Sequence, residues 1–508
     1  EDVWDYEMSD TALVAKHLET VRISLDDDNI NNRTSTLAQH HIAHVMGNLY
    51  NAEFAFLVWT KEGVHFGRDR WGRRSLLLWT CPEGCGSFQI VSVAEPLSPE
   101  TTAQTSKEGM MLPAVSHLDW TELEPGKVHS ILFSNASSTL SEQIEIALTS
   151  MDFPEISFKT LRRTDAEPTI AAMPSNAYNI PDRMWTASLE LEFHLRRAVR
   201  MRLDQSALCS TGILFSGGVD SVVVTALAAD ILSSLPKHPT NQNATTTGPT
   251  LHLYNVSFGP HHEKSADRKA ALMSYQALQD RYRDCENGFV LVFHDIVVEW
   301  DDICQAEPHI RTLLLPKSTV MDVNIATALW FASRGGTMGE KNGIIHASNS
   351  TTNECQLARE RQCPRVLLLG MGADETLGGY GRHRKAYEQG GWLRLKEELE
   401  MDQGRLWERN LGRDDRLCSD HGREARFPFL DAHVVKFLQE TPLQDICDFD
   451  LPPGKGDKRI LRLIASRLGM DHASGLVKRA IQFGSRISHL SDTKRFGSRR
   501  KAKGETTI

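Results

Sequence analysis

The chain has 508 residues, of which 40% are hydrophobic and 24% charged, a balance typical of soluble globular proteins and a length suited to two or three domains. Its formal net charge of −9 at pH 7 argues against a nucleic-acid binder, and no apolar run is long enough to cross a membrane. The nine cysteines are scattered and form no complete zinc pattern, so we expect a reduced, cytoplasmic protein with neither nucleic acid nor membrane as a partner.

The first 150 residues have a strand-rich pattern with few helices. Apolar strands are predicted at Phe54–Trp59 and Val64–Phe66, and the stretch "FGRDRWGRRSLLLW" that follows reads as a turn and another strand. The chain starts at Glu1 rather than at methionine, and we expect it to be a fragment that lacks its true N-terminus.

A different pattern begins after a polar, proline-rich stretch at residues 151–183, which we interpret as a linker. Over residues 184–490, apolar strands alternate with helical stretches, and residues 491–508 form a basic tail. This alternation predicts an α/β fold with a doubly wound parallel sheet, which binds ligands beyond the carboxyl ends of its strands. The predicted strands are Ile213–Phe215, Leu251–Phe258, Phe289–Phe293 and Val366–Leu369.

The stretch "ILFSGGVDSVV" places a glycine turn between the first of these strands and a helix. Gly217 and Gly218 permit a sharp turn, Ser216 and Ser221 add hydroxyl donors, and the helix N-terminus offers free N–H groups. This arrangement suits a phosphate. Asp220 is explained if a magnesium ion lies between its carboxylate and that phosphate.

A second turn of the same kind follows the strand at Val366–Leu369, in the stretch "GMGADETLGGY". Gly370 and Gly372 precede two carboxylates, Asp374 and Glu375. Two glycine turns at strand ends, each followed by an acid, indicate that both face one ligand. Carboxylates from separate turns suit magnesium ions on a nucleoside triphosphate.

These two motifs together resemble the ATP-pyrophosphatase (PP-loop) domain of the glutamine-hydrolysing asparagine synthetase family. The segments "NLGRDDRLCSDHGREARFPFLD" and "GDKRILRLIA" are similar to further family motifs, and "GRDRWGRRSLLLW" resembles a strand of its amidotransferase domain. The resemblance implies an N-terminally truncated, type-2 glutamine amidotransferase domain of Ntn hydrolase-like α+β fold over residues 1–150. It implies the asparagine synthetase domain over residues 184–490.

The resemblance also implies a reaction, in which ammonia from glutamine converts aspartate to asparagine while ATP, with Mg²⁺, is split to AMP and pyrophosphate. By the same resemblance Asp220 and Asp374 would be catalytic and carry the metal, and Asp10 would hold the amino group of glutamine. Pyrophosphate and ATP would be bound by Ser216, Gly217, Gly218 and Ser221, with Leu214, Phe258 and Gly370 bordering the nucleotide.

The chain departs from the family pattern at three places. The N-terminal cysteine nucleophile is absent, Met371 stands where active members have a glutamate, and Ala480 stands where they have a lysine. Methionine cannot accept a proton. A lysine at the second position would stabilise charge on the α-phosphate, and Lys478 or Arg479 would have to reach in instead, although neither has the expected position. Two alternatives therefore stay open beside the synthetase: a nucleotide-binding pseudoenzyme that acts as a binding module, and an ATP-pyrophosphatase with another acceptor.

Overall fold

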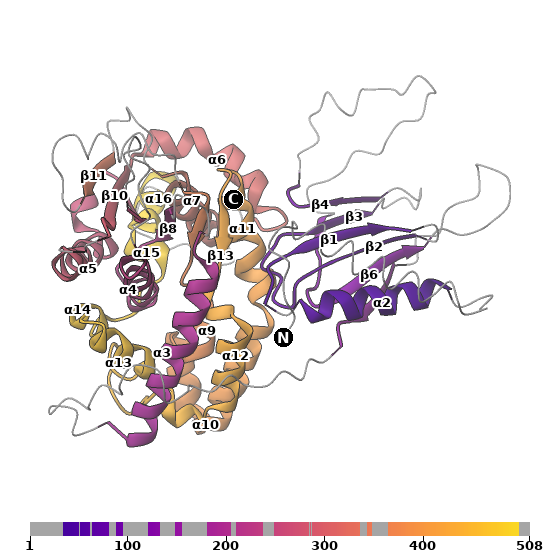
Figure 1. The fold of residues 1–508 in the computed structure, drawn as a ribbon. Helices are drawn as coiled ribbons and strands as arrows, with labels where there is room; N and C mark the ends of the chain where they lie inside the picture. Colours follow the sequence, from indigo (N-terminus) through magenta and orange to yellow (C-terminus); the bar gives the residue numbers. More distant parts are fainter. Residues whose placement is uncertain are drawn as a thin grey trace. The chain divides into compact units, whose positions relative to one another are not determined.

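The chain, seen as a computed structural model in Figure 1, divides into two compact units. The first comprises residues 1–159 with 407–412, and the second comprises residues 160–406 with 413–508. The structure describes residues 34–49, 51–60, 63–80, 88–94, 120–132, 148–154, 180–204, 210–236, 248–283, 285, 287–335, 343–347 and 364–496.

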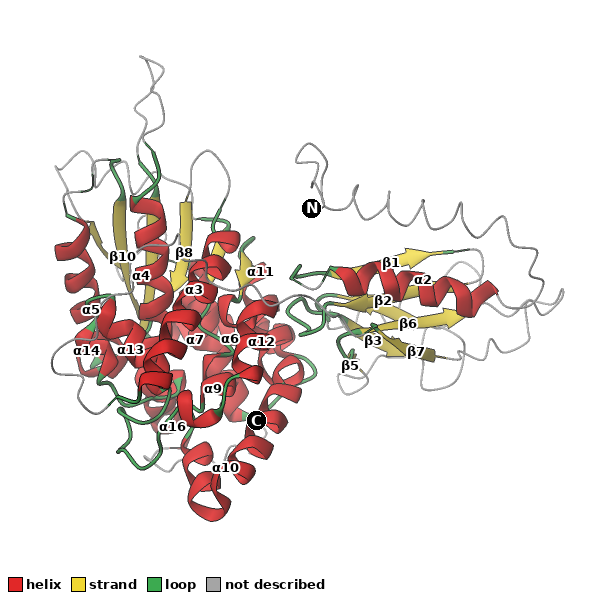
Figure 2. Ribbon diagram, turned by 60° about the horizontal axis from the view of Figure 1, so that its bottom comes forward, coloured by secondary structure: helices red, strands yellow, loops and turns green. Residues whose placement is uncertain are grey.

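The first unit contains two antiparallel sheets, with strand orders β1-β2-β6-β7 and β4-β3-β5. Alternate residues of β2, such as Val64 and Phe66, pack with Leu78 of the smaller sheet and with Leu76 just before it, as the period of two along a strand requires. Figure 2 shows α2 along the larger sheet. The elements are α2 (Thr34–Asn48), β1 (Ala55–Trp59), β2 (Gly63–Arg68), β3 (Leu77–Thr80), β4 (Phe88–Val91), β5 (Trp120–Glu122), β6 (Lys127–Leu132) and β7 (Leu148–Asp152).

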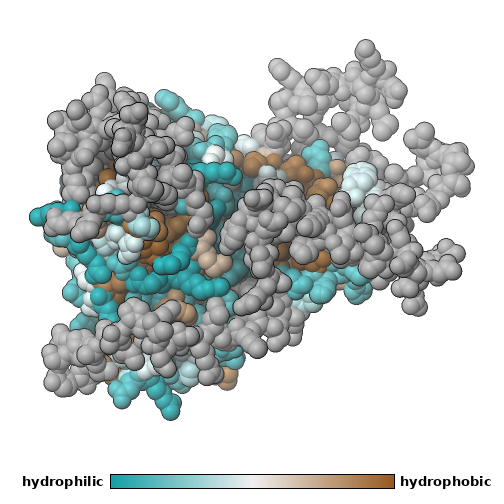
Figure 3. All heavy atoms as spheres, in the orientation of Figure 1, coloured by the Kyte–Doolittle hydropathy of each residue, from teal (hydrophilic) through white to brown (hydrophobic). Residues whose placement is uncertain are grey.

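The strands predicted at Phe54–Trp59 and Val64–Phe66 are confirmed as β1 and β2. In the motif that follows, the Asp69 carboxylate stabilises the turn by accepting hydrogen bonds of 3.0 Å from the N–H groups of Trp71 and Arg73, and Arg68 forms a buried ion pair with Glu122 at 3.1 Å. Figure 3 shows hydrophobic side chains over the strands of this unit.

The second unit is built on a six-stranded sheet of order β11-β10-β9-β8-β12-β13. β10 pairs with β9, β9 with β8, β8 with β12 and β12 with β13, each time in parallel. The edge strand β11 pairs antiparallel with β10. The predicted parallel sheet is therefore confirmed. The strands are β8 (Ser210–Leu214), β9 (Thr250–Phe258), β10 (Val290–Val298), β11 (Gly343–Ala347), β12 (Val366–Leu368) and β13 (Glu424–Arg426).

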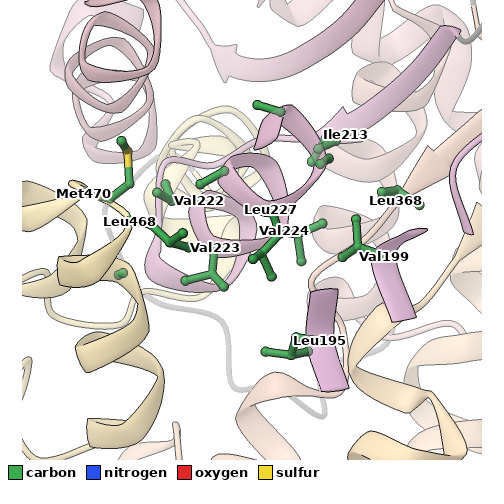
Figure 4. Close-up of a cluster of buried hydrophobic side chains, with 14 of the residues drawn as sticks. Leu195, Val199, Ile213, Val222, Val223, Val224, Leu227, Leu368, Leu468 and Met470 are labelled. Carbon is green, nitrogen blue, oxygen red and sulfur yellow. The ribbon is translucent and has the colours of Figure 1, made fainter. Parts of the chain in front are cut away.

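Helices surround this sheet, and α4 lies at the centre of the core. Figure 4 shows its valines and Leu227 among side chains from α3, β8 and β12. Because α4 is apolar on all sides, it is buried all round. The helices are α3 (Asp182–Arg202), α4 (Val219–Ser233), α5 (Ala266–Tyr282), α6 (Trp300–Leu314), α7 (Val320–Arg334), α9 (Ala373–Leu377), α10 (Gly381–Gly404), α11 (Gly412–Ser419), α12 (Ala432–Glu440), α13 (Arg459–Arg467), α14 (Asp471–Ser474), α15 (Ile481–Gly484) and α16 (Ile487–Phe496).

Regular structure extends past the boundaries that we expected from composition. β7 runs to Asp152 because it pairs with β6, and α3 begins at Asp182, so both ends of the expected linker are structured. α16 runs through the expected start of the basic tail to Phe496, since Ser491 and Asp492 are buried. Within the described ranges, every helix is too short or too polar to span a membrane.

Candidate functional site

The first glycine turn joins β8 to α4, as predicted. Gly218 is the N-cap residue of α4, and the Oγ atoms of Ser216 and Ser221 lie 3.4 Å apart beside it. Gly217 has φ +75°, and a Cβ atom there would overlap the backbone of Ala271 in α5. Glycine is therefore required at position 217 because the turn packs closely against a helix.

The second turn lies directly beside the first, because β12 and β8 are neighbours in the sheet. A Cβ atom at Gly370 would lie 3.1 Å from the Cβ atom of Asp220. Asp374 follows in the short helix α9 and is 7% exposed. The two predicted carboxylates therefore come from turns that contact each other.

Lys458 joins these two carboxylates. Its Nζ donates to Asp220 at 2.7 Å (Oδ1) and 2.6 Å (Oδ2), and it lies 2.6 Å from Oδ1 of Asp374. A Cβ atom at Gly379 would overlap both the Asp374 carboxylate and the Lys458 side chain. Because Gly379 has no side chain, Lys458 has room to reach the Asp374 carboxylate.

Lys478 supplies a second cation to the same cluster, with Nζ 2.5 Å from Oδ2 of Asp374. Burial would raise the pKa of Asp374, but Lys458 and Lys478 together lower it well below its usual range. Burial would likewise lower the pKa of Lys478, but Asp374 and Asp220 raise it. Asp374 and Lys478 are therefore both charged at neutral pH.

A third carboxyl group, Glu375, lies behind this cluster. It is 4% exposed and accepts a hydrogen bond of 2.7 Å from the hydroxyl of Tyr380. Burial, and then the charge of Asp374, raise the pKa of Glu375. Nζ of Lys478 lies 5.8 Å from the centroid of the Tyr380 ring. Tyr380 therefore contacts Glu375 through its hydroxyl and Lys478 through its ring.

Two cavities open at this cluster. The first extends over the ends of β8, β9 and β12 and encloses about 780 Å³ together with the open solvent at its mouth. The second lies under the first turn of α4 and encloses about 500 Å³ counted in the same way. Both are open, and they meet at one set of charged and polar side chains. Five residues line both cavities: Ser216, Asp220, Asp267, Lys478 and Arg479.

The structure brings most of the predicted site residues to these cavities. The first cavity is lined by Leu214, Ser216, Asp220, Ser221, Gly370 and Asp374, and the second also by Gly218. Gly217 and Phe258 line neither of the two. Phe258 is 1% exposed and packs against Phe331 with ring centroids 6.3 Å apart, and Asp10 lies outside the described residues.

The sequence analysis missed three residues of this site: Lys458, Asp267 and Asn255. Lys458 lies in the quoted "GDKRILRLIA" motif, but its partners are far away in the sequence. Lys478 and Arg479, the two residues before Ala480, are the candidates for the role of the missing lysine, and both line the two cavities. Asp267 lies in the stretch "FGPHHEKSADRKAA", which is similar to a segment of the same family, but nothing in the sequence singles out Asp267 or Asn255 as a site residue; both line the first cavity.

Asp220 and Asp374 are a suitable pair for a magnesium ion. Magnesium is typically held by one or two carboxylates together with phosphate oxygens and water. Among the described residues, no group of three or more His, Cys, Asp or Glu side chains could hold a metal ion. The contacts of the two carboxylates with Lys458 and Lys478 show that this position stabilises positive charge.

Comparison with known proteins agrees with this geometry. The family model described as Asparagine synthase matches residues 190–284 and 385–472, which include the first glycine turn and Lys458. The chain is 38% identical over 309 residues to asparagine synthetase domain-containing protein 1 of Gallus gallus, a match that covers 55% of this chain and 46% of the relative. The chain thus spans about half the length of the curated relatives that it matches in this way.

Two other relatives extend the comparison. Asparagine synthetase domain-containing protein CG17486 of Drosophila melanogaster is 26% identical over 544 residues, covering 96% of this chain and 84% of that protein. The putative asparagine synthetase [glutamine-hydrolyzing] 1 of Methanocaldococcus jannaschii is 44% identical over 80 residues, covering 16% of this chain and 15% of that protein. The chain therefore carries an asparagine synthase family domain and is similar to the asparagine synthetase domain-containing proteins.

Proposed function

We propose that the chain is an ATP- and magnesium-dependent amide ligase of the asparagine synthetase type, which forms AMP and pyrophosphate. One observation carries this proposal: Asp220, Asp374, Lys458 and Lys478 meet where two glycine turns and the N-terminus of α4 converge. Such a cluster lies between two cavities. It therefore suits a nucleoside triphosphate that reacts at its α-phosphorus.

The second cavity has the features of a pyrophosphate site. Its wall combines Ser216, Gly218 and the positive end of the 15-residue helix α4 with the cations Lys458 and Arg462. Backbone N–H groups at a helix N-terminus and nearby lysine or arginine side chains are the usual donors to phosphate. We propose that the β- and γ-phosphates of ATP bind here and leave from here as pyrophosphate.

The α-phosphorus would then lie where the cavities meet, beside Lys478 and Arg479. Asp220 and Asp374 would hold Mg²⁺, which when bound neutralises charge on the phosphate oxygens. Lys478 and Arg479 would stabilise the negative charge that develops when an aspartate carboxylate attacks the α-phosphorus and the bond to pyrophosphate breaks.

The second half of the proposed reaction forms the amide bond. Ammonia attacks the carbonyl carbon of the aspartyl adenylate, AMP leaves, and one proton passes to a base, giving asparagine. We propose that residues 1–150 belong to a glutamine amidotransferase-type domain; because the cysteine nucleophile of such domains is absent from this sequence, a chain with this sequence needs ammonia supplied directly. The two facing antiparallel sheets of the first unit support this assignment.

A second candidate function is a nucleotide-binding module without ligase activity. Met371 favours it, because this side chain lines the first cavity at the second glycine turn and offers no atom that accepts a proton. An ATP-pyrophosphatase with another acceptor would use the same phosphate site, since fold alone does not fix the acceptor.

The test is pyrophosphate release from Mg-ATP by the full chain with aspartate and ammonium supplied, which removes the need for glutamine. Asp220→Asn removes one carboxylate of the cluster, and Asp280→Asn, at an exposed position of α5, is the matched control. We expect aspartate-dependent release that Asp220→Asn abolishes and Asp280→Asn leaves intact. Release without dependence on aspartate would indicate another acceptor, and nucleotide binding without any release would indicate the binding module.

A further inference from the structure

The first cavity contains a buried hydrogen-bond acceptor that the proposed reaction does not use. Asn255, in β9, is 2% exposed and lines this cavity. Its Nδ2 donates to the carbonyl oxygen of Phe215 at 2.8 Å. Its Oδ1 is also buried, and no donor within the described part of the chain hydrogen-bonds to it.

The local structure explains why this side chain is fixed. The ladder between β8 and β9 ends with Leu214 opposite Tyr254, and the N–H of Phe215 still donates to the carbonyl of Tyr254 at 2.8 Å. The side-chain amide of Asn255 then donates to the carbonyl of Phe215. It therefore provides the next hydrogen bond between the two segments, where β8 has ended. One N–H of Nδ2 is used in this way and fixes the amide, and Oδ1, which has no donor among the described residues, is the acceptor that Asn255 offers to a ligand.

The cavity combines charged and apolar walls, and Asn255 is not among the charged and polar side chains that line both cavities. The charged wall is shared with the second cavity, at Asp220 and Lys478. Leu329 and Ala332 of α7, which are 2% and 3% exposed, line the first cavity only. A nucleoside triphosphate with its phosphates at the charged wall would place its flat, largely apolar base at the apolar wall.

We infer that Asn255 determines which nucleobase this site accepts, by receiving a hydrogen bond at Oδ1 from the exocyclic amino group of adenine. Guanine and hypoxanthine carry a carbonyl oxygen at the same ring position, so two acceptors would face each other. A buried polar atom left without its partner disfavours the wrong ligand. This inference rests on the proposed function, because it requires a nucleoside triphosphate in the cavity.

The test compares three magnesium nucleotides by equilibrium titration of the full chain: ATP, purine riboside triphosphate, which lacks the amino group, and inosine triphosphate, which carries the carbonyl. We expect the wild-type protein to bind ATP about tenfold more tightly than the nucleotide without the amino group, the weight of one net hydrogen bond, and inosine triphosphate more weakly still. In Asn255→Leu and in the smaller Asn255→Ser, the ratio of the first two affinities falls to about one.

A variant that binds all nucleotides more weakly keeps the same ratio of affinities for ATP and the nucleotide without the amino group, so this ratio is not changed by a general loss of affinity. The ratio for the wild-type protein is measured without any variant. Equal binding of ATP and its analogue by the wild-type protein, or a ratio that survives in both variants, overturns the role of Asn255. In either case, nucleotide binding that depends on Asp220 leaves the proposed function standing. If the wild-type protein binds none of the three nucleotides, both the role of Asn255 and the proposed function fail.

Discussion

Replacing Lys458 with methionine tests whether the lysine neutralises the carboxylate pair. Methionine keeps much of the apolar stem but removes the ammonium that contacts Asp220 and Asp374. The Lys458 side chain is 1% exposed, and those of Asp220 and Asp374 are 17% and 9% exposed. Removing one partner of a buried ion pair typically costs about 3–5 kcal/mol. Because Lys478 still contacts Asp374, we expect the lower end, about 3 kcal/mol.

The assay is urea unfolding with and without Mg²⁺, with Lys455→Met as the control at an exposed position three residues earlier. Lys458→Met should lower the free energy of unfolding, whereas Lys455→Met should change it by less than about 0.5 kcal/mol. Added Mg²⁺ should stabilise Lys458→Met more than the wild-type protein, because it binds the freed carboxylates of the folded state. A loss below about 1 kcal/mol, or the same response to Mg²⁺ in both proteins, would refute this account of the cluster.

Three further predictions follow from the same contacts. Gly379→Ala should displace Lys458 and abolish pyrophosphate release, whereas Gly381→Ala, whose added Cβ has no atom within 4 Å, should leave release unchanged in the same assay. Burial raises the pKa of Asp267 to about 7, so the unfolded chain loses this proton at lower pH than the folded chain. The free energy of unfolding should therefore fall as pH rises from about 4 to 7, and by less in Asp267→Asn. Burial lowers the pKa of His194 from 6.5 to about 4, so stability should instead fall as pH drops across that interval, and denaturation at several pH values should show less of this fall in His194→Leu.

The parallel sheet and both glycine turns could be predicted because each signal lies within a few consecutive residues. An apolar run that ends in glycine followed by an acid indicates a strand, a turn and a helix without knowledge of the rest of the chain. The helix α4 is predictable for the same reason.

The role of Lys458 could not be assigned in this way. Lys458 and Asp220 are 238 residues apart, and they meet because α13 packs against α4. The sequence offers many lysines and no local pattern that selects this one. The role of Gly217 was also out of reach, since its close neighbour, Ala271, belongs to another helix.

Ala480 shows that a missing side chain can be replaced by one from a neighbouring position in the sequence. At that position the expected lysine is missing, yet Lys478, two residues earlier, places its Nζ 2.5 Å from Asp374 and lines both cavities. A lysine has a long flexible stem, so its ammonium can reach a site from a neighbouring position.

The departure at Met371 is of another kind, because methionine lacks the chemical group that accepts a proton and a longer side chain would not supply it. Its side chain lines the first cavity, and a thioether is at most a weak acceptor. In the proposed reaction the two departures therefore bear on different steps: Lys478 would act where pyrophosphate leaves, and Met371 would stand where ammonia loses a proton. Pyrophosphate release and asparagine formation, measured on the same sample, separate them. A protein that releases pyrophosphate but forms no asparagine has kept the adenylating cations and lost the proton acceptor. A protein that completes both steps takes the proton elsewhere, and Asp267, which lines the same cavity with a pKa raised by burial to about 7, is the group to substitute next.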